Sequence, residues 1–181
     1  MEITLQGNLR ASGLMTRVAL AKGMRWGLIG GVAGTLVMDL VLMGALSAAG
    51  LPALTCFSIV GDTVARFFSI LGIEMAGGVP VGVATHYSVG PVVGIIFGAA
   101  VAQVEALRLD TPKKSIVLAV LYVEILSQPM LAMTPILLKM TAAEALQWFG
   151  GSFVLHFIWG TVLGVIVYHG LRSATAANPI S

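Results

Sequence analysis

The stretch from residue 79 to residue 104 reads VPVGVATHYSVGPVVGIIFGAAVAQV and contains no Asp, Glu, Lys or Arg. An α-helix needs about 20 consecutive, mainly apolar residues to cross the hydrocarbon core of a bilayer. This stretch is long enough and apolar enough to do so. It therefore predicts a transmembrane helix.

Three more stretches meet the same criterion, and each has one ionisable residue within its apolar run. The whole chain agrees with them, because 57% of its 181 residues are hydrophobic and only 10% are charged. Soluble domains carry about 25% charged residues, so lipid is the expected solvent. The stretches are 26–49, 116–138 and 150–168, and their ionisable residues are Asp39, Glu124 and His156. The sequence predicts an all-α, four-helix integral membrane bundle.

The basic residues are distributed unevenly between the two sides of these spans. Eight of the 10 lie before the first span, between the second and third, or after the fourth, and only Arg66 and Lys139 lie in the other connections. Positive charge favours the cytoplasmic side of a membrane, which predicts that both termini are cytoplasmic. We expect a basic segment at 1–25, a transmembrane domain at 26–172 and a loose tail at 173–181. The net charge of only +2 argues against a nucleic-acid partner.

The first outer connection, from Pro52 to Gly78, is neither a span nor a simple loop. Its apolar residues recur at helical spacing, with Asp62 and Arg66 between them. This pattern is typical of an amphipathic helix that lies at a membrane surface. The chain has a single cysteine, Cys56, which excludes an internal disulfide.

The second and fourth spans share a motif. HYSVGPVVGII begins at His86 and HFIWGTVLGVI begins at His156, and both have a histidine, an aromatic residue and glycines at +4 and +8. The match predicts two parallel repeats of a helical hairpin, related by an axis along the membrane normal. Glycines four residues apart let helix backbones approach closely. They could alternatively form a groove for a flat ligand.

Each span also carries polar side chains far from its cytoplasmic end. At about 1.5 Å per residue from the nearest inner charge, Asp39 and Gln128 lie roughly 21 Å deep, His156 roughly 24 Å and His86 roughly 28 Å. Glu124 lies one turn closer to the middle of the membrane than Gln128. Ionisable residues within a bilayer are costly and often functional. We expect these side chains to meet in the outer half of the membrane.

Three interpretations of such a cluster remain open. It could be a structural set of hydrogen bonds between helices. It could be a site for a transition-metal ion or protons, used in transport or handling. It could hold a b-type haem between His86 and His156, in an accessory subunit of a larger respiratory or photosynthetic complex. The candidate metal ligands are His86, His156, Asp39, Glu124, Gln128 and Met130. No catalytic motif is present, so we do not expect an enzyme.

Four short motifs resemble a family of uncharacterised bacterial four-helix inner-membrane proteins, known as a domain of unknown function. The resemblance covers about residues 26–170 and departs from the family at Leu131–Pro135, where members carry an arginine-rich stretch. It implies a multi-pass protein of the bacterial inner membrane. The small size and glycine-rich helix faces separately predict lipid, and other membrane subunits or further copies of the chain, as partners. The resemblance implies no activity. The motifs are Val37-Met38-Asp39-Leu40, His86-Tyr87 with Gly90, Gln128-Pro129-Met130, and His156 with Gly160.

Overall fold

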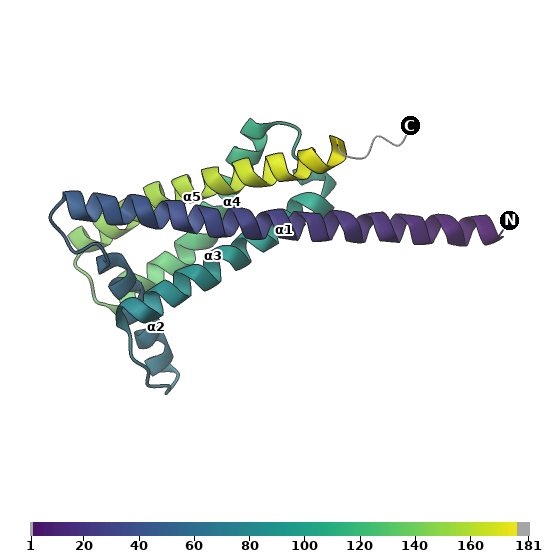
Figure 1. The fold of residues 1–181 in the computed structure, drawn as a ribbon. Helices are drawn as coiled ribbons and strands as arrows, with labels where there is room; N and C mark the ends of the chain where they lie inside the picture. The colour runs from purple at the N-terminus through teal and green to yellow at the C-terminus, as the bar shows by residue number, and fades with distance from the viewer. Residues whose placement is uncertain (1, 177–181) are drawn as a thin grey trace.

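The structure is a computed structural model that describes residues 2–176, with side chains for residues 17–173. The described part is entirely helical apart from its connections (Figure 1). The elements are α1 (Glu2–Ala48), α2 (Thr55–Ile70), α3 (Gly78–Gln103), the short 3-10 helix η1 (Glu105–Leu107), α4 (Pro112–Leu137) and α5 (Ala142–Ala176).

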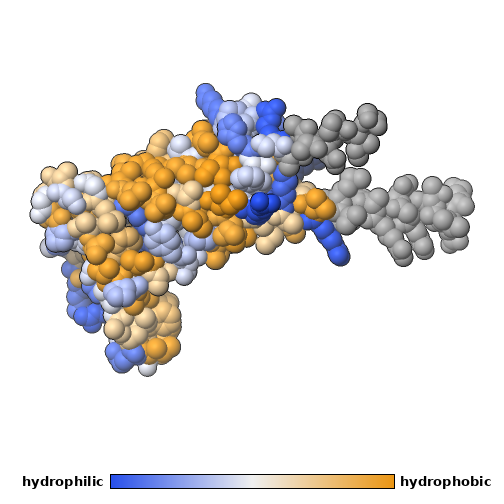
Figure 2. Space-filling view, viewed as in Figure 1, coloured by the Kyte–Doolittle hydropathy of each residue, from blue (hydrophilic) through white to orange (hydrophobic). Residues whose placement is uncertain are grey.

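Four of these helices are long and apolar enough to cross a membrane, as predicted. The candidate spans are Arg17–Ala48 in α1, the whole of α3, the whole of α4, and Ala142–Ser173 in α5. Figure 2 shows hydrophobic side chains over much of the visible face of the bundle, with hydrophilic ones near the end where the termini emerge and also around α2 at the other end. We call the end where the termini emerge the terminal end and the opposite one the α2 end. The predicted orientation in the membrane stays a prediction.

Local sequence fixes where α4 and α5 begin. The Thr111 hydroxyl accepts a hydrogen bond from the Lys114 amide, with a proline in the first turn, so α4 starts at Pro112. At α5 the Thr141 hydroxyl accepts from the Glu144 amide, and the Glu144 carboxylate accepts from the Thr141 amide at 2.7 Å. This reciprocal pair is a capping box. It explains why α5 starts at Ala142, eight residues before the predicted span.

Glycines bring α1 and α3 into direct backbone contact. A Cβ atom added to Gly94 would meet the Gly27 carbonyl and would lie 2.8 Å from the Gly31 Cα atom. Gly98 would likewise meet the carbonyl of Gly23. Helices in lipid are held together by such close packing rather than by the hydrophobic effect. The predicted glycine stripe on the second span is therefore the surface that packs on the first.

The fourth span uses its glycines in the same way on the third. A Cβ atom at Gly160 would lie 2.8 Å from the Val120 Cα atom, and one at Gly164 would lie 2.8 Å from the Ile116 Cα atom. The Ser115 hydroxyl donates to the Gly164 carbonyl at 2.7 Å, which adds a buried hydrogen bond between the helices. α4 and α5 thus form a second tightly packed pair.

The four spans form an incomplete ring. α1 packs on α3, α4 packs on α5, and α1 also packs along α5, whereas α3 and α4 hardly touch. Near the terminal end the ring is filled by a hydrophobic core that includes Phe97, Ala119, Leu163 and Val167. Towards the α2 end the helices diverge (Figure 1). A cavity lies in that half of the bundle, with residues of both α3 and α4 in its wall.

The helix predicted in the first outer connection is α2, which packs mainly on α3. Its Gly61 lies against the backbone of Gly78, and Phe57 is almost fully buried. The Asp62 carboxylate accepts a hydrogen bond of 2.8 Å from the Gly78 amide and so satisfies a donor at the start of α3. α2 therefore lies across one end of the bundle. Its position at a membrane surface stays a prediction.

The backbone contact between α1 and α3 can be tested with the substitution Gly94→Ala. The added methyl group has no room, so we expect the free energy of unfolding in bicelles to fall by about 1–3 kcal/mol. Gly44→Ala is the matched control, because a Cβ atom at Gly44 meets nothing within 4 Å. Equal unfolding free energies for the two variants would contradict the proposed contact.

Candidate functional site

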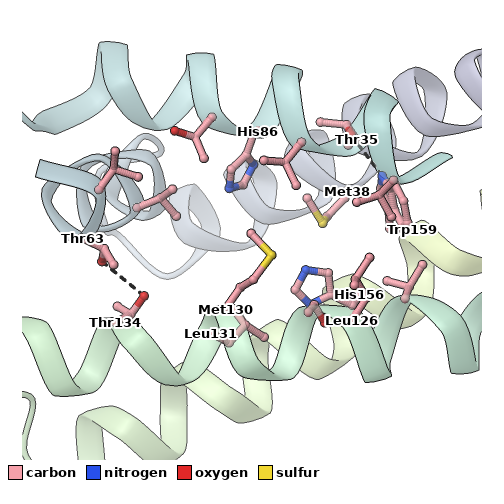
Figure 3. A pocket seen from close by; sticks show the side chains of 18 of the residues that line it. Thr35, Met38, Thr63, His86, Leu126, Met130, Leu131, Thr134, His156 and Trp159 are labelled. Carbon is pink, nitrogen blue, oxygen red and sulfur yellow. Dashed lines mark hydrogen bonds between the residues drawn. The ribbon is translucent and has the colours of Figure 1, made fainter. Parts of the chain in front are cut away.

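A cavity of about 200 Å³ lies inside the diverging half of the bundle (Figure 3). All five helices contribute to its wall, and most of the lining side chains are apolar. The polar groups in the wall are two histidines, the side chains of Thr35, Thr63, Thr85, Ser127 and Thr134, and the indole nitrogens of Trp148 and Trp159. Among the described residues that line it, there is no Lys or Arg.

His86 forms the centre of the site together with Asp39. The His86 Nδ1 atom lies 3.0 Å from Asp39 Oδ1, and the Asp39 side chain is almost fully buried between α1 and α3. With Asp39 ionised, the His86 Nδ1–H donates at this contact, because a carboxylate without a proton can only accept. The other ring nitrogen, Nε2, is then the one available to a ligand. The edge of the Phe57 ring packs on the imidazole, with 5.1 Å between centroids.

His156 lines the same cavity from α5. Figure 3 shows the imidazoles of His86 and His156 on opposite sides, with the Met130 side chain between them. His156 Nδ1 is buried and has no hydrogen bond of normal geometry in the described part, although the Ser152 backbone lies nearby. His156 therefore brings a second imidazole, weakly held by its own helix, to the wall of the cavity.

The inner wall of the cavity contains a buried hydrogen-bond chain between α1 and α5. The Trp159 indole nitrogen donates to the Thr35 hydroxyl at 3.0 Å, and that hydroxyl donates to the Gly31 carbonyl at 2.9 Å. The sequence patterns did not single out Thr35 or Trp159 as site residues. Trp159 lies three residues after His156 and therefore shares its helix face, which is the signal that could have identified it.

A proline in α4 explains another contact. Pro135 has no N–H, so the Leu131 carbonyl four residues earlier has no helical donor. The Trp148 indole nitrogen on α5 donates to that carbonyl at 3.1 Å. One turn away from the carbonyl, the Thr134 hydroxyl pairs with the Thr63 hydroxyl of α2 at 3.2 Å. The irregular end of α4 is thus tied to both α5 and α2.

The structure divides the six predicted ligands into two groups. His86, His156 and Met130 line the cavity, and Asp39 supports His86 from behind. Glu124 and Gln128 lie on another face of α4, where the Gln128 amide donates to the Glu124 carboxylate at 3.0 Å. They border a separate depression with Phe149 and Phe153 of α5. The position of a residue in the sequence gives its depth along a helix. It does not give the rotation of the helix, which decides whether a side chain faces the cavity.

No group of three or more His, Cys, Asp or Glu side chains among the described residues is placed to hold a metal ion. Such a site needs several donors around one point, typically four for zinc. The separation of Glu124 and Gln128 from the two histidines accounts for this result, because it removes one carboxylate and the amide from the predicted set.

Cys56 lies on α2 close to this site. Burial, together with the negative charge of Asp39, raises the pKa of the Cys56 thiol to about 11. The thiolate is the reactive form of cysteine, so a raised pKa makes the thiol unreactive at neutral pH. Cys56 is therefore part of the apolar surroundings of the His86–Asp39 pair rather than a nucleophile.

No family model, curated protein or solved structure matches this chain. The resemblance to an uncharacterised inner-membrane family therefore stays a prediction. Four long apolar helices are what the fold itself supports.

The pKa of Cys56 predicts how its reaction with a maleimide depends on pH. At pH 7 we expect a rate about 100-fold below that of an ordinary thiol, and a rise that continues up to about pH 11. Cys56 is the only cysteine, so the unmodified chain in detergent can be used. Ile70→Cys in a Cys56→Ser background is the exposed control on the same helix. A Cys56 rate that levels off near pH 9 would contradict the raised pKa.

Proposed function

We propose that this protein binds a small uncharged molecule inside the bilayer and exchanges a proton with it at the His86–Asp39 pair. The observation that carries the proposal is this buried pair, with its 3.0 Å contact, at the wall of an apolar cavity that also holds His156. The role is binding and handling of a membrane-dissolved molecule rather than catalysis.

The geometry of the pair supports proton exchange. The Asp39 carboxylate holds the His86 Nδ1–H, which fixes the ring and leaves Nε2 to accept a proton from a ligand. When Nε2 is protonated, the adjacent carboxylate stabilises the positive charge of the imidazolium. A lone imidazole in hydrocarbon would lack this compensation. With the proton bound, the pair is a neutral ion pair; after release it carries the single negative charge of Asp39, which the His86 Nδ1–H hydrogen bond stabilises.

The same observations favour protons over the metal ion that the sequence left open. A proton site needs only one histidine with its carboxylate, which the cavity supplies. A metal site of the predicted composition would also need Glu124 and Gln128, which face elsewhere. The metal interpretation stays a prediction that no group of acidic, histidine or cysteine side chains in the described residues supports.

A haem site has little support from the size of the cavity. Ligand sites usually measure about 300–1,000 Å³, and this cavity measures about 200 Å³. Close glycine packing also fixes each histidine-bearing helix against its neighbour, α3 on α1 and α5 on α4. An accessory role in a larger complex stays a prediction, as does self-association.

The proposed repeat gains support from the use of its shared residues. In both motifs the glycines pack on the preceding span, α1 or α4, while the histidine borders the cavity. Two hairpins related by a pseudo-two-fold axis would place their histidines on opposite sides of a central site. With both termini cytoplasmic in a bacterial plasma membrane, α2 and the cavity would lie towards the outer surface.

Native mass spectrometry of the protein, gently solubilised from bacterial membranes, tests this proposal. We expect one neutral small molecule per chain, with at least a tenfold lower occupancy in His86→Ala and in Asp39→Asn. His169→Ala is the matched control, because His169 lies near Tyr168 at the terminal end, away from the cavity. The proposal fails if no neutral molecule is retained, or if His86→Ala and His169→Ala retain it equally.

A further inference from the structure

The cavity has an opening towards the bilayer between α3 and α4. The Tyr122 hydroxyl of α4 donates to the Val93 carbonyl of α3 at 3.1 Å, which joins the two helices on the terminal side of the cavity. On the other side, α2 bridges them through the pair of Thr63 and Thr134 hydroxyls. Between these two hydrogen bonds the helices do not close, and the lining residues Leu126 and Met130 are 40% and 51% exposed.

The cavity is covered on the sides of α1 and α5. α1 packs on α3 and on α5, α5 packs on α4, and α2 packs on α3 and more lightly on α4. The gap between α3 and α4 is therefore the opening, and both helices are candidate membrane spans. A molecule that passes through it comes from the hydrocarbon phase of the membrane rather than from water.

We propose that the molecule is a lipid-soluble compound of the quinone class, whose ring occupies the cavity while its tail extends through the α3–α4 opening. This inference rests on the proposed function and names the class of its ligand. It concerns binding alone and includes no electron transfer.

The volume of the cavity fits one ring. An engineered protein cavity of about 150 Å³ holds benzene, so about 200 Å³ holds one substituted six-membered ring. A fused-ring molecule or a long folded chain would not fit. Any tail on the ring has to leave by the opening, and there it meets lipid.

The polar groups fit a ring with an oxygen at each end. His86 and His156 face the cavity from opposite sides, and the flexible Met130 side chain between them, as Figure 3 shows, has to swing aside for a bound ring. A hydroquinone hydroxyl can donate to His86 Nε2, and a quinone carbonyl can accept from a ring nitrogen once that nitrogen carries a proton. The lack of Lys and Arg among the described lining residues disfavours a carboxylate or phosphate headgroup, whose charge would be buried without a partner.

The class of ligand can be tested by adding a decyl-substituted benzoquinone to the full chain in nanodiscs. Trp148 and Trp159 line the cavity, so a bound ring should quench their fluorescence. We expect saturable quenching at one molecule per chain. A water-soluble, sulfonated benzoquinone and decanoate should give no saturable signal, because one is charged and the other has no ring.

Two substitutions on α3 locate the binding. Val89 lines the cavity, and Val89→Phe should raise the dissociation constant of the decyl-benzoquinone at least tenfold. Val92 is 54% exposed on the outside of the same helix, and Val92→Phe should leave the constant within twofold. Thermal melting of both variants shows whether each is folded. The wild-type titration stands as a test even if Val89→Phe does not fold.

The inference is overturned if the wild type shows no saturable quenching, if both valine variants bind equally, or if decanoate or the sulfonated quinone competes as well as the decyl compound. The proposed function fails separately. If native mass spectrometry retains a neutral molecule that is not a quinone, binding inside the bilayer stands and only the ligand class is wrong.

Discussion

The close backbone contact at the glycines is the constraint on which the rest of the structure depends. Gly94 on Gly27 and Gly164 on Ile116 lock each hairpin, because no side chain stands between the helices. Each locked hairpin uses the glycine face of its second helix. α3 and α4 are left to face each other with larger side chains and without such contact, so the bundle closes at one end and opens at the other.

The buried carboxylate of Asp39 lies in the half of the bundle that contains the cavity. An Asp within hydrocarbon costs about 2.5–3.5 kcal/mol on insertion scales. His86 offsets part of this cost through one hydrogen bond to Asp39, but the second oxygen of Asp39 has no hydrogen bond of normal geometry in the described part, although the Tyr87 hydroxyl lies nearby. A fold stabilised only by packing would not need this pair. Its position at a cavity wall is the observation behind the proposed binding role.

Sequence patterns predicted the four spans, because a span is recognised from the length and composition of an apolar stretch alone. They also placed His86, Asp39 and His156 at similar depth, and two of these three line one cavity while the third supports it. They did not separate Glu124 and Gln128 from the others, since helix rotation depends on which glycines find a partner. The Trp159–Thr35 and Trp148–Leu131 contacts join different helices and were equally out of reach. The start of α5 was predicted too late in the chain. The Thr141–Glu144 capping box lets the helix begin at Ala142, before the apolar stretch from which the span was predicted.

The opening between α3 and α4 is the central claim, and spin-label accessibility in nanodiscs tests it most directly. In a Cys56→Ser background, single labels would be placed at Val89, which lines the cavity, and at Val92, which faces outwards. If the cavity opens towards the bilayer, molecular oxygen, which concentrates in lipid, will relax both labels to a similar extent, while a water-soluble nickel chelate will relax neither. A label at Val89 that is shielded from oxygen, or one that the nickel chelate reaches, would contradict an opening towards the bilayer.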